Sequence, residues 1–149
     1  MIGLIADTHG LMRPEALQAL GGVDVILHAG DVGGPAVLDA LWTIAPVHAV
    51  RGNVDTAGAE LRDALSLELD GVRVHLSHGD ELGSPTPAAL AARYRADVIV
   101  YGHTHRPLVT HVGPTLVVNP GAAGPARFNL KPSIGLLILP AREARIVMV

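Results

Sequence analysis

The chain has 149 residues, 49% of them hydrophobic, and its 11 Lys and Arg against 14 Asp and Glu give a formal net charge of −3. This length and apolar content predict one self-sufficient domain over residues 1–149. The negative charge argues against a basic nucleic-acid-binding domain, and no apolar run reaches the roughly 18 residues of a membrane span. There is no cysteine, which excludes disulfides, thiolate metal sites and cysteine nucleophiles.

The compartment and assembly follow from the same composition. A chain without cysteine fits a reducing compartment, and no basic leader precedes the first apolar run, so we expect a cytoplasmic protein. Charged residues make up only 17% of the chain, against about a quarter in a typical domain. We therefore expect a largely neutral surface, part of which a homo-oligomer would bury.

The first third of the chain alternates unbroken apolar runs with helical stretches that begin at proline. Unbroken apolar runs are typical of strands covered on both faces, and strands alternating with helices predict parallel pairing. The expected strands are 2–6, 23–29 and 47–50, and the expected helices begin at Pro14 and span 35–42. We expect Trp42 to lie in the core with the leucines of its helix.

The pattern then changes to alternation of apolar and polar residues around Asp70-Gly71, a strong signal for a two-residue hairpin turn. A third helix (87 to about 95), a strand (98–101) and two hairpin-like pairs follow (108–111 with 115–118, and 134–139 with 146–149). These elements predict a mixed α/β domain of two stacked sheets with helices outside.

Five loops that follow predicted strands carry side chains able to bind a metal ion. Ligands of α/β sheets bind outside the carboxyl ends of strands, so we expect these loops to meet at one rim. The side chains, in chain order, are Asp7, His9, Asp31, Asn53, His78, His103 and His105. This set of carboxylates, amide and imidazoles suits Mn²⁺, Fe, Zn²⁺ or Ni²⁺ better than Ca²⁺ or a soft metal, and we favour Mn²⁺.

Seven ligands are too many for one catalytic ion, because a catalytic site usually leaves a position open to water or substrate. Two divalent ions roughly 3.5–4 Å apart, bridged by a carboxylate and a hydroxide, would use the whole set for phosphoryl displacement. Asp31 is the best candidate for the bridge. Glycines next to or one residue from the ligands would let the backbone approach an ion closely: Gly10, Gly30, Gly52, Gly79 and Gly102.

Each short motif alone is more often a turn than a site, so the prediction depends on their combination. His103-Thr104-His105 also fits all-β metal barrels, which lack the N-terminal strand–helix units, and zinc hydrolase barrels, which typically need about 250 residues. Two assignments stay open. His28 is either a partner of the ligands or a satisfied core histidine, and Asn119 either points its amide to the rim or forms a tight turn.

The order of motifs closely resembles the calcineurin-like metallophosphoesterases, and among them the small single-domain phosphodiesterase branch. The motifs are Asp7-x-His9, Gly30-Asp31, Gly52-Asn53, His78-Gly79 and Gly102-His103-x-His105, and the resemblance runs from Ile2 to about Leu139. It implies an αββα sandwich of four layers, with two mixed β-sheets and flanking helices. It also implies hydrolysis of phosphodiesters or activated phosphomonoesters by a hydroxide that bridges two metal ions.

By position, the resemblance implies one ion held by Asp7, His9, Asp31 and His105 and a second held by Asp31, Asn53, His78 and His103. Two positions depart from the pattern. Many superfamily members carry histidine after the motif asparagine, where this chain has Val54, and the branch often reads His-Gly-His where this chain ends in Asp80. Asp80 would act as a substitute acid beside Asn53 and His78, or it would repel phosphate.

Two other functions remain open. The small retromer subunit resembles this fold but serves mainly as a docking surface, so a non-catalytic interaction scaffold is the main alternative. A nucleotide-specific pyrophosphohydrolase differs only in substrate, and Tyr101 and Phe128 are the aromatic residues near enough to the motif loops to stack on a base.

Overall fold

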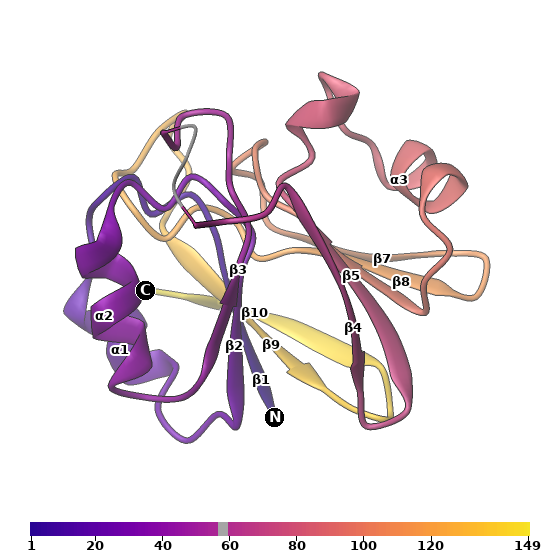
Figure 1. Cartoon of the computed structure of the whole chain (residues 1–149), viewed down its shortest axis with the longest axis horizontal. Coiled ribbons are helices and arrows are strands. Elements are labelled where there is room, and N and C mark those ends of the chain that lie inside the picture. The colour runs from indigo at the N-terminus through magenta and orange to yellow at the C-terminus, as the bar shows by residue number, and fades with distance from the viewer. Residues whose placement is uncertain (57–59) are drawn as a thin grey trace.

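The computed structural model describes residues 1–56 and 60–149, which form two five-stranded sheets (Figure 1). The first sheet has the order β10-β9-β1-β2-β3 and the second the order β4-β5-β6-β8-β7. The first sheet consists of β1 (Ile2–Ile5), β2 (Val25–His28), β3 (Val47–Ala49), β9 (Ser133–Ile138) and β10 (Glu143–Met148). The second consists of β4 (Ala64–Leu69), β5 (Val72–Ser77), β6 (Val98–Val100), β7 (Leu108–Val112) and β8 (Thr115–Asn119).

Both sheets are mixed. In the first, β1, β2 and β3 pair in parallel, and β9 joins the other edge of β1 in antiparallel orientation. All four residues of β1 are buried, as expected for an unbroken apolar run covered on both faces. In the second sheet, β4 and β5 form the predicted hairpin, with Asp70 and Gly71 at φ of 50° and 74°. A two-residue hairpin loop with a type I′ turn requires positive φ at both turn residues.

The sheets stack face to face and helices cover their outer faces, so the predicted four-layer αββα sandwich is confirmed (Figure 1). The helices are α1 (Pro14–Ala19), α2 (Pro35–Trp42) and α3 (Pro87–Arg93), and a 3₁₀ turn, η1, spans Asp80–Leu82. Leu4 and Leu27 of the first sheet pack against Leu76 of the second in the central core. Helices α1 and α2 pack on the first sheet and α3 on the second.

Trp42 is not in the core, contrary to the expectation from the sequence. Its side chain is 55% exposed, while Val37 and Leu41 are the buried residues of α2. Residues four apart share one face of a helix, and Trp42 follows Leu41 by about 100° around the axis, off that buried stripe.

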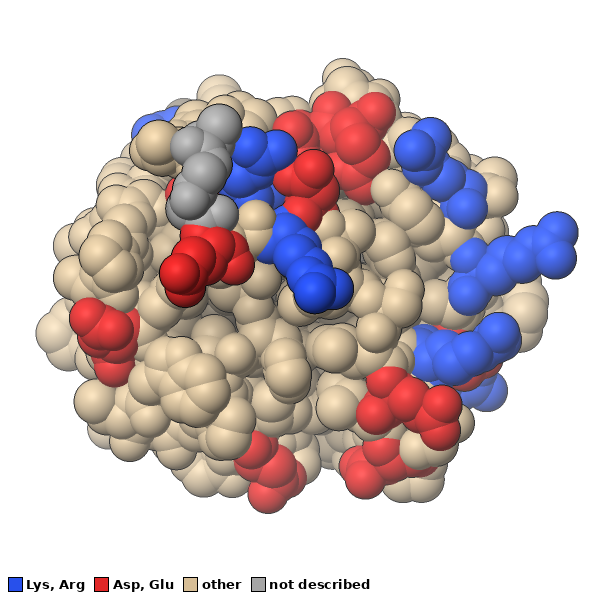
Figure 2. Space-filling model, in the orientation of Figure 1, with Lys and Arg blue, Asp and Glu red and all other residues tan. Residues whose placement is uncertain are grey.

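The surface agrees with the low charge content. Figure 2 shows charged side chains separated by broad uncharged areas on the face drawn. In the part of the chain that the structure describes, none of the helices is both long enough and apolar enough to cross a bilayer.

Candidate metal centre

The seven predicted ligands meet at the rim where strands of both sheets end. Asp7, His9, Asp31 and Asn53 follow β1, β2 and β3 of the first sheet, and His78, His103 and His105 follow β5 and β6 of the second. A continuous series of contacts of 4.0 Å or less joins all seven side chains. The loops that follow these strands therefore meet at one rim, as the sequence pattern predicts.

Asp7 lies at the centre of the group. Its Oδ1 is 3.4 Å from Nε2 of His105, 3.9 Å from Nε2 of His78 and 4.0 Å from Nε2 of His9. This oxygen is buried and accepts no hydrogen bond from any described residue. Two ligands that each lie about 2.1 Å from a shared ion are separated by roughly 3–4 Å. A buried carboxylate oxygen with no donor, facing three imidazole nitrogens at such distances, fits a cation.

His78 fits a cation for a second reason. Its Nδ1 is 2.7 Å from the carbonyl oxygen of Ala29, which can only accept, so Nδ1 carries a hydrogen. Its Nε2 then faces oxygens: Oδ1 of Asn53 at 2.9 Å and Oδ2 of Asp31 at 3.2 Å. An imidazole lone pair among oxygens is repelled unless a proton or a metal ion lies between them.

The pKa values of the site reflect this crowding. Burial lowers the pKa of His78, but the hydrogen bond to Asp31 and the charges of Asp7 and Asp31 outweigh burial and raise the pKa to about 9. Burial raises the pKa of Asp31, and hydrogen bonds from His78 and the Val54 amide outweigh it, so this pKa is lowered. In the metal-free protein a proton on His78 therefore takes the place that a cation would occupy.

The two carboxylates share the central place. Asp7 belongs to both compact sets of donors, one with His9 and His105 and one with Asp31 and His78, and within each set the donor atoms lie within 4.8 Å of one another. Oδ2 of Asp31, the predicted bridge, lies 3.7 Å from Nε2 of His9 and 3.2 Å from Nε2 of His78. His103 joins at the rim, with Nδ1 3.1 Å from Oδ1 of Asn53.

The backbone of the site is strained. Five of the predicted ligands have positive φ: Asp7 (52°), His9 (48°), Asp31 (53°), His103 (69°) and His105 (60°). Left-handed backbone is uncommon outside glycine and clusters at functional sites. Two glycines make room for the ligands: a Cβ on Gly52 would overlap the Asp31 carboxylate, and one on Gly30 would lie 2.7 Å from Nδ1 of His78.

Residues 1–141 of the chain match the calcineurin-like phosphoesterase superfamily domain. The chain belongs to this superfamily. A probable metallophosphoesterase of Methanothermobacter thermautotrophicus is 37% identical over 148 residues, which cover 92% of this chain and 84% of that protein. The likeness to a calcineurin-like phosphoesterase predicted from the motifs is thus confirmed, and membership of the superfamily implies divalent metal ions.

Solved structures agree on the fold. An archaeal phosphodiesterase superposes with a TM-score of 0.83 at 25% identity, covering 99% of each chain. Wild-type Vps29 of Entamoeba histolytica, crystallised with Zn²⁺, superposes with a TM-score of 0.82 at 28% identity, covering 97% of this chain and 89% of that one.

Behind the ligands of this phosphoesterase domain, two polar side chains that the sequence left open are fully buried and hydrogen-bonded. The Asn119 amide donates to the Gly102 carbonyl (2.9 Å) and to Oγ1 of Thr104 (3.0 Å), so it braces the loop that carries His103 and His105. Nδ1 of His28 accepts from the Gly30 amide (3.2 Å), and Nε2 lies 2.9 Å from Oγ1 of Thr8. Oδ1 of Asn119 also accepts the Gly121 amide (2.9 Å), so Asn119 forms the tight turn as well as bracing the loop. His28 forms hydrogen bonds with Thr8 and the Gly30 backbone and with no ligand side chain among the described residues, so it is a satisfied buried histidine next to the ligand loops.

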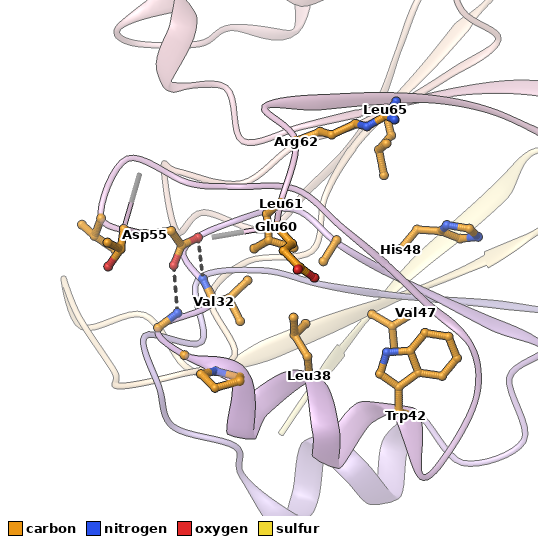
Figure 3. A pocket seen from close by; sticks show the side chains of 16 residues that line it. Val32, Leu38, Trp42, Val47, His48, Asp55, Glu60, Leu61, Arg62 and Leu65 are labelled. Carbon is orange, nitrogen blue, oxygen red and sulfur yellow. Dashed lines mark hydrogen bonds between the residues drawn. The ribbon is translucent and has the colours of Figure 1, made fainter. Parts of the chain in front are cut away.

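Two cavities flank the site. One of about 530 Å³ is lined by Asn53, Asp80, Arg51, Arg93 and Tyr94, among others, so it opens directly beside the predicted ligand Asn53. A larger one of about 870 Å³ lies over α2 and β3, with Leu38, Trp42 and Val47 on its floor (Figure 3). The larger cavity touches the ligand loops only through residues such as Val32, Val54 and Asp55, so the smaller one is better placed for a substrate.

The two aromatic residues considered for base stacking differ in position. Tyr101 is only 3% exposed and packs under α3 with Leu90, so it cannot contact a substrate. Phe128 is 70% exposed, and its ring centroid lies 5.9 Å from that of His105, edge to face. The sequence analysis gives no role to Asp55, which lies two residues after Asn53 in the same loop, although an Asp in such a loop is a frequent acceptor of backbone N–H groups.

Proposed function

We propose that this phosphoesterase-superfamily protein hydrolyses phosphodiesters or activated phosphomonoesters with two divalent metal ions. The observation that carries the proposal is the continuous contact of seven side chains with nitrogen and oxygen donor atoms at one rim. At its centre lies Oδ1 of Asp7, which has no hydrogen-bond donor among the described residues. A purely structural polar cluster would satisfy that buried oxygen with a donor.

The donors divide into two overlapping sets. Asp7, His9, Asp31 and His105 would hold one ion, and Asp31, Asn53, His78 and His103 the other. Because all donors are nitrogen or oxygen, Mn²⁺, Fe, Zn²⁺ and Ni²⁺ all suit the set, and we favour Mn²⁺. When bound, such a pair of ions supplies an activated water near neutral pH and neutralises charge that develops on the phosphoryl oxygens.

The protein itself orients these groups. The Ala29 carbonyl fixes the His78 ring so that Nε2 faces the rim, and Oδ2 of Asp7 accepts the His103 amide at 3.1 Å, which ties the two sheets together at the site. The cavity beside Asn53 would receive one ester group, and there Asp80, which is half-buried, would protonate the leaving oxygen.

The decisive experiment replaces the predicted bridge. The chelator-stripped protein, the Asp31→Asn variant and a control, Asp97→Asn, are assayed on bis(4-nitrophenyl) phosphate with added Mn²⁺. Asp97 is distant from the rim and bonds Arg73. Mutation of a residue that supports a metal ligand typically lowers metal affinity or activity 10–100-fold. We therefore expect Asp31→Asn, which removes the bridging ligand itself, to lower the hydrolysis rate more than about 100-fold. A folded Asp31→Asn protein with wild-type activity would refute the assignment.

The main alternative, a non-catalytic interaction scaffold of the same fold, makes a different prediction. A scaffold would turn over no phosphoester with any divalent metal, and its partner binding would survive chelation. Activity that disappears with chelator and returns with Mn²⁺ separates the two, and metal analysis of the purified protein gives the number of ions bound.

A further inference from the structure

The Asp55 carboxylate joins the two loops of the first sheet that carry predicted ligands. It accepts hydrogen bonds from the backbone amides of Val32 (3.1 Å) and Gly33 (2.9 Å), which follow Asp31. It also accepts from the amide of Gly52 (2.9 Å), which precedes Asn53. Figure 3 shows Asp55 reaching across to the Val32 loop.

These bonds fix the distance between two ligands that are far apart in the sequence. Asp31 and Asn53 both direct an oxygen at Nε2 of His78, at 3.2 Å and 2.9 Å. A second link runs the other way, because Oδ1 of Asp31 accepts the Val54 amide at 3.0 Å. Both links cross between the same two loops, so a shift of one loop would carry its ligand out of line with the other.

Of these two links between the loops, the one through Asp55 involves no side-chain atom of a predicted metal ligand. Val32 is 2% exposed, so its amide has no ready access to water if the carboxylate is removed. Backbone donors without an acceptor would reorganise the turn, and the turn holds Asp31 at a strained φ of 53°. Removal of the Asp55 carboxylate would therefore displace the ligand Asp31.

We propose that Asp55 is a positioning residue that sets Asp31 and Asn53 at the spacing needed to bind the same metal ion. The proposal rests on the proposed metal-dependent function of the rim, but it concerns ion binding and not turnover. A carboxylate is required because one side chain must accept from three amides, whereas asparagine offers one acceptor oxygen and would turn an N–H group toward an amide.

The test compares Mn²⁺ binding to chelator-stripped wild type, Asp55→Asn and Asp55→Ala by calorimetry. The matched control is Asp97→Asn, because Asp97 also accepts a hydrogen bond from a backbone amide, that of Arg73 at 2.9 Å, but lies just before β6, at the end of that strand away from the rim. We expect the Mn²⁺ dissociation constant to rise about 10–100-fold in Asp55→Asn and further in Asp55→Ala, with the control unchanged. If Asp55→Ala does not fold, the milder Asn variant carries the test.

The outcomes separate the two proposals. A folded Asp55→Asn protein that binds Mn²⁺ within twofold of wild type, with only its unfolding midpoint lowered, would show a purely structural turn and overturn the inference. Wild type that binds Mn²⁺ but hydrolyses no ester would refute the proposed function while leaving the Asp55 comparison intact. Wild type that binds no Mn²⁺ would overturn both.

Discussion

His28 makes the stability of the protein sensitive to acid. Burial is the main cause that lowers its pKa from 6.5 to about 4, and the nearby carboxylates Asp7 and Asp55 only partly oppose it. Its hydrogen bonds require the neutral ring: Nδ1 accepts the Gly30 amide, so Nε2 carries the hydrogen and donates to Oγ1 of Thr8. A second proton on the ring would have to bind Nδ1, where the new N–H group would face the Gly30 N–H group and be repelled by it.

The direction and size of the change in stability with pH follow from the pKa values of His28 in the unfolded and folded chain. The unfolded chain takes up the His28 proton near pH 6.5 and the folded protein only near pH 4, so stability is complete above pH 6.5 and falls as pH drops toward 4. The difference between these two pKa values corresponds to roughly 3 kcal/mol of unfolding free energy, and most of this stabilisation is lost by about pH 4.5. That loss is a large part of the 5–15 kcal/mol typical of a domain.

The assay is urea unfolding of the metal-free protein between pH 7.5 and 4.5, followed by far-ultraviolet circular dichroism because the exposed Trp42 is a poor fluorescence probe. His28→Gln keeps a donor and an acceptor but does not titrate. We expect it to be less stable than wild type at pH 7.5, and the difference to shrink by roughly 2–3 kcal/mol at pH 4.5. The control His111→Gln replaces an exposed imidazole and should keep the wild-type slope. An unchanged pH slope in His28→Gln would refute the argument.

Three further predictions concern the rim. Val54 is 56% exposed beside Asn53, so Val54→His should supply an acid and raise turnover of a glycerophosphodiester by up to about 100-fold, with less gain on bis(4-nitrophenyl) phosphate; equal gains would contradict this. Asp80→Asn should slow the glycerophosphodiester and spare the nitrophenyl ester, whereas faster turnover would indicate that Asp80 repels phosphate. Phe128→Ala should raise KM for the nitrophenyl ester about 2–10-fold, the worth of an aromatic contact, and an equal rise for the glycerophosphodiester would count against stacking.

Local patterns in the sequence were enough to predict much of the fold. The unbroken apolar run at β1 and the alternation around Asp70-Gly71 each correspond to one local structure, and the strand ends led to all seven rim residues. Long-range pairing was beyond such patterns: nothing local indicates that β9 lies against β1, or that β10 begins at Glu143 rather than near Ile146.

The wrong and missing assignments have different causes. Residue type alone predicts Trp42 in the core, but the spacing of Val37 and Leu41 marks a buried stripe of the helix that does not include it. Closeness in sequence to His103 makes Tyr101 a candidate for substrate contact, but successive side chains of a strand point to opposite faces, and Tyr101 faces α3. Asp55 acts through backbone amides of a loop more than twenty residues away, a relation visible only in three dimensions.

Because four rim donors come from one sheet and three from the other, an ion bound there would act as a cross-link between the two halves of the sandwich. By mass action, added metal would then raise the free energy needed to separate the sheets, and substitutions deep in the inter-sheet core, such as at Leu76, would weaken metal affinity from a distance. Chelation would loosen the whole sandwich as well as emptying its rim, so protease resistance and ion content should rise and fall together.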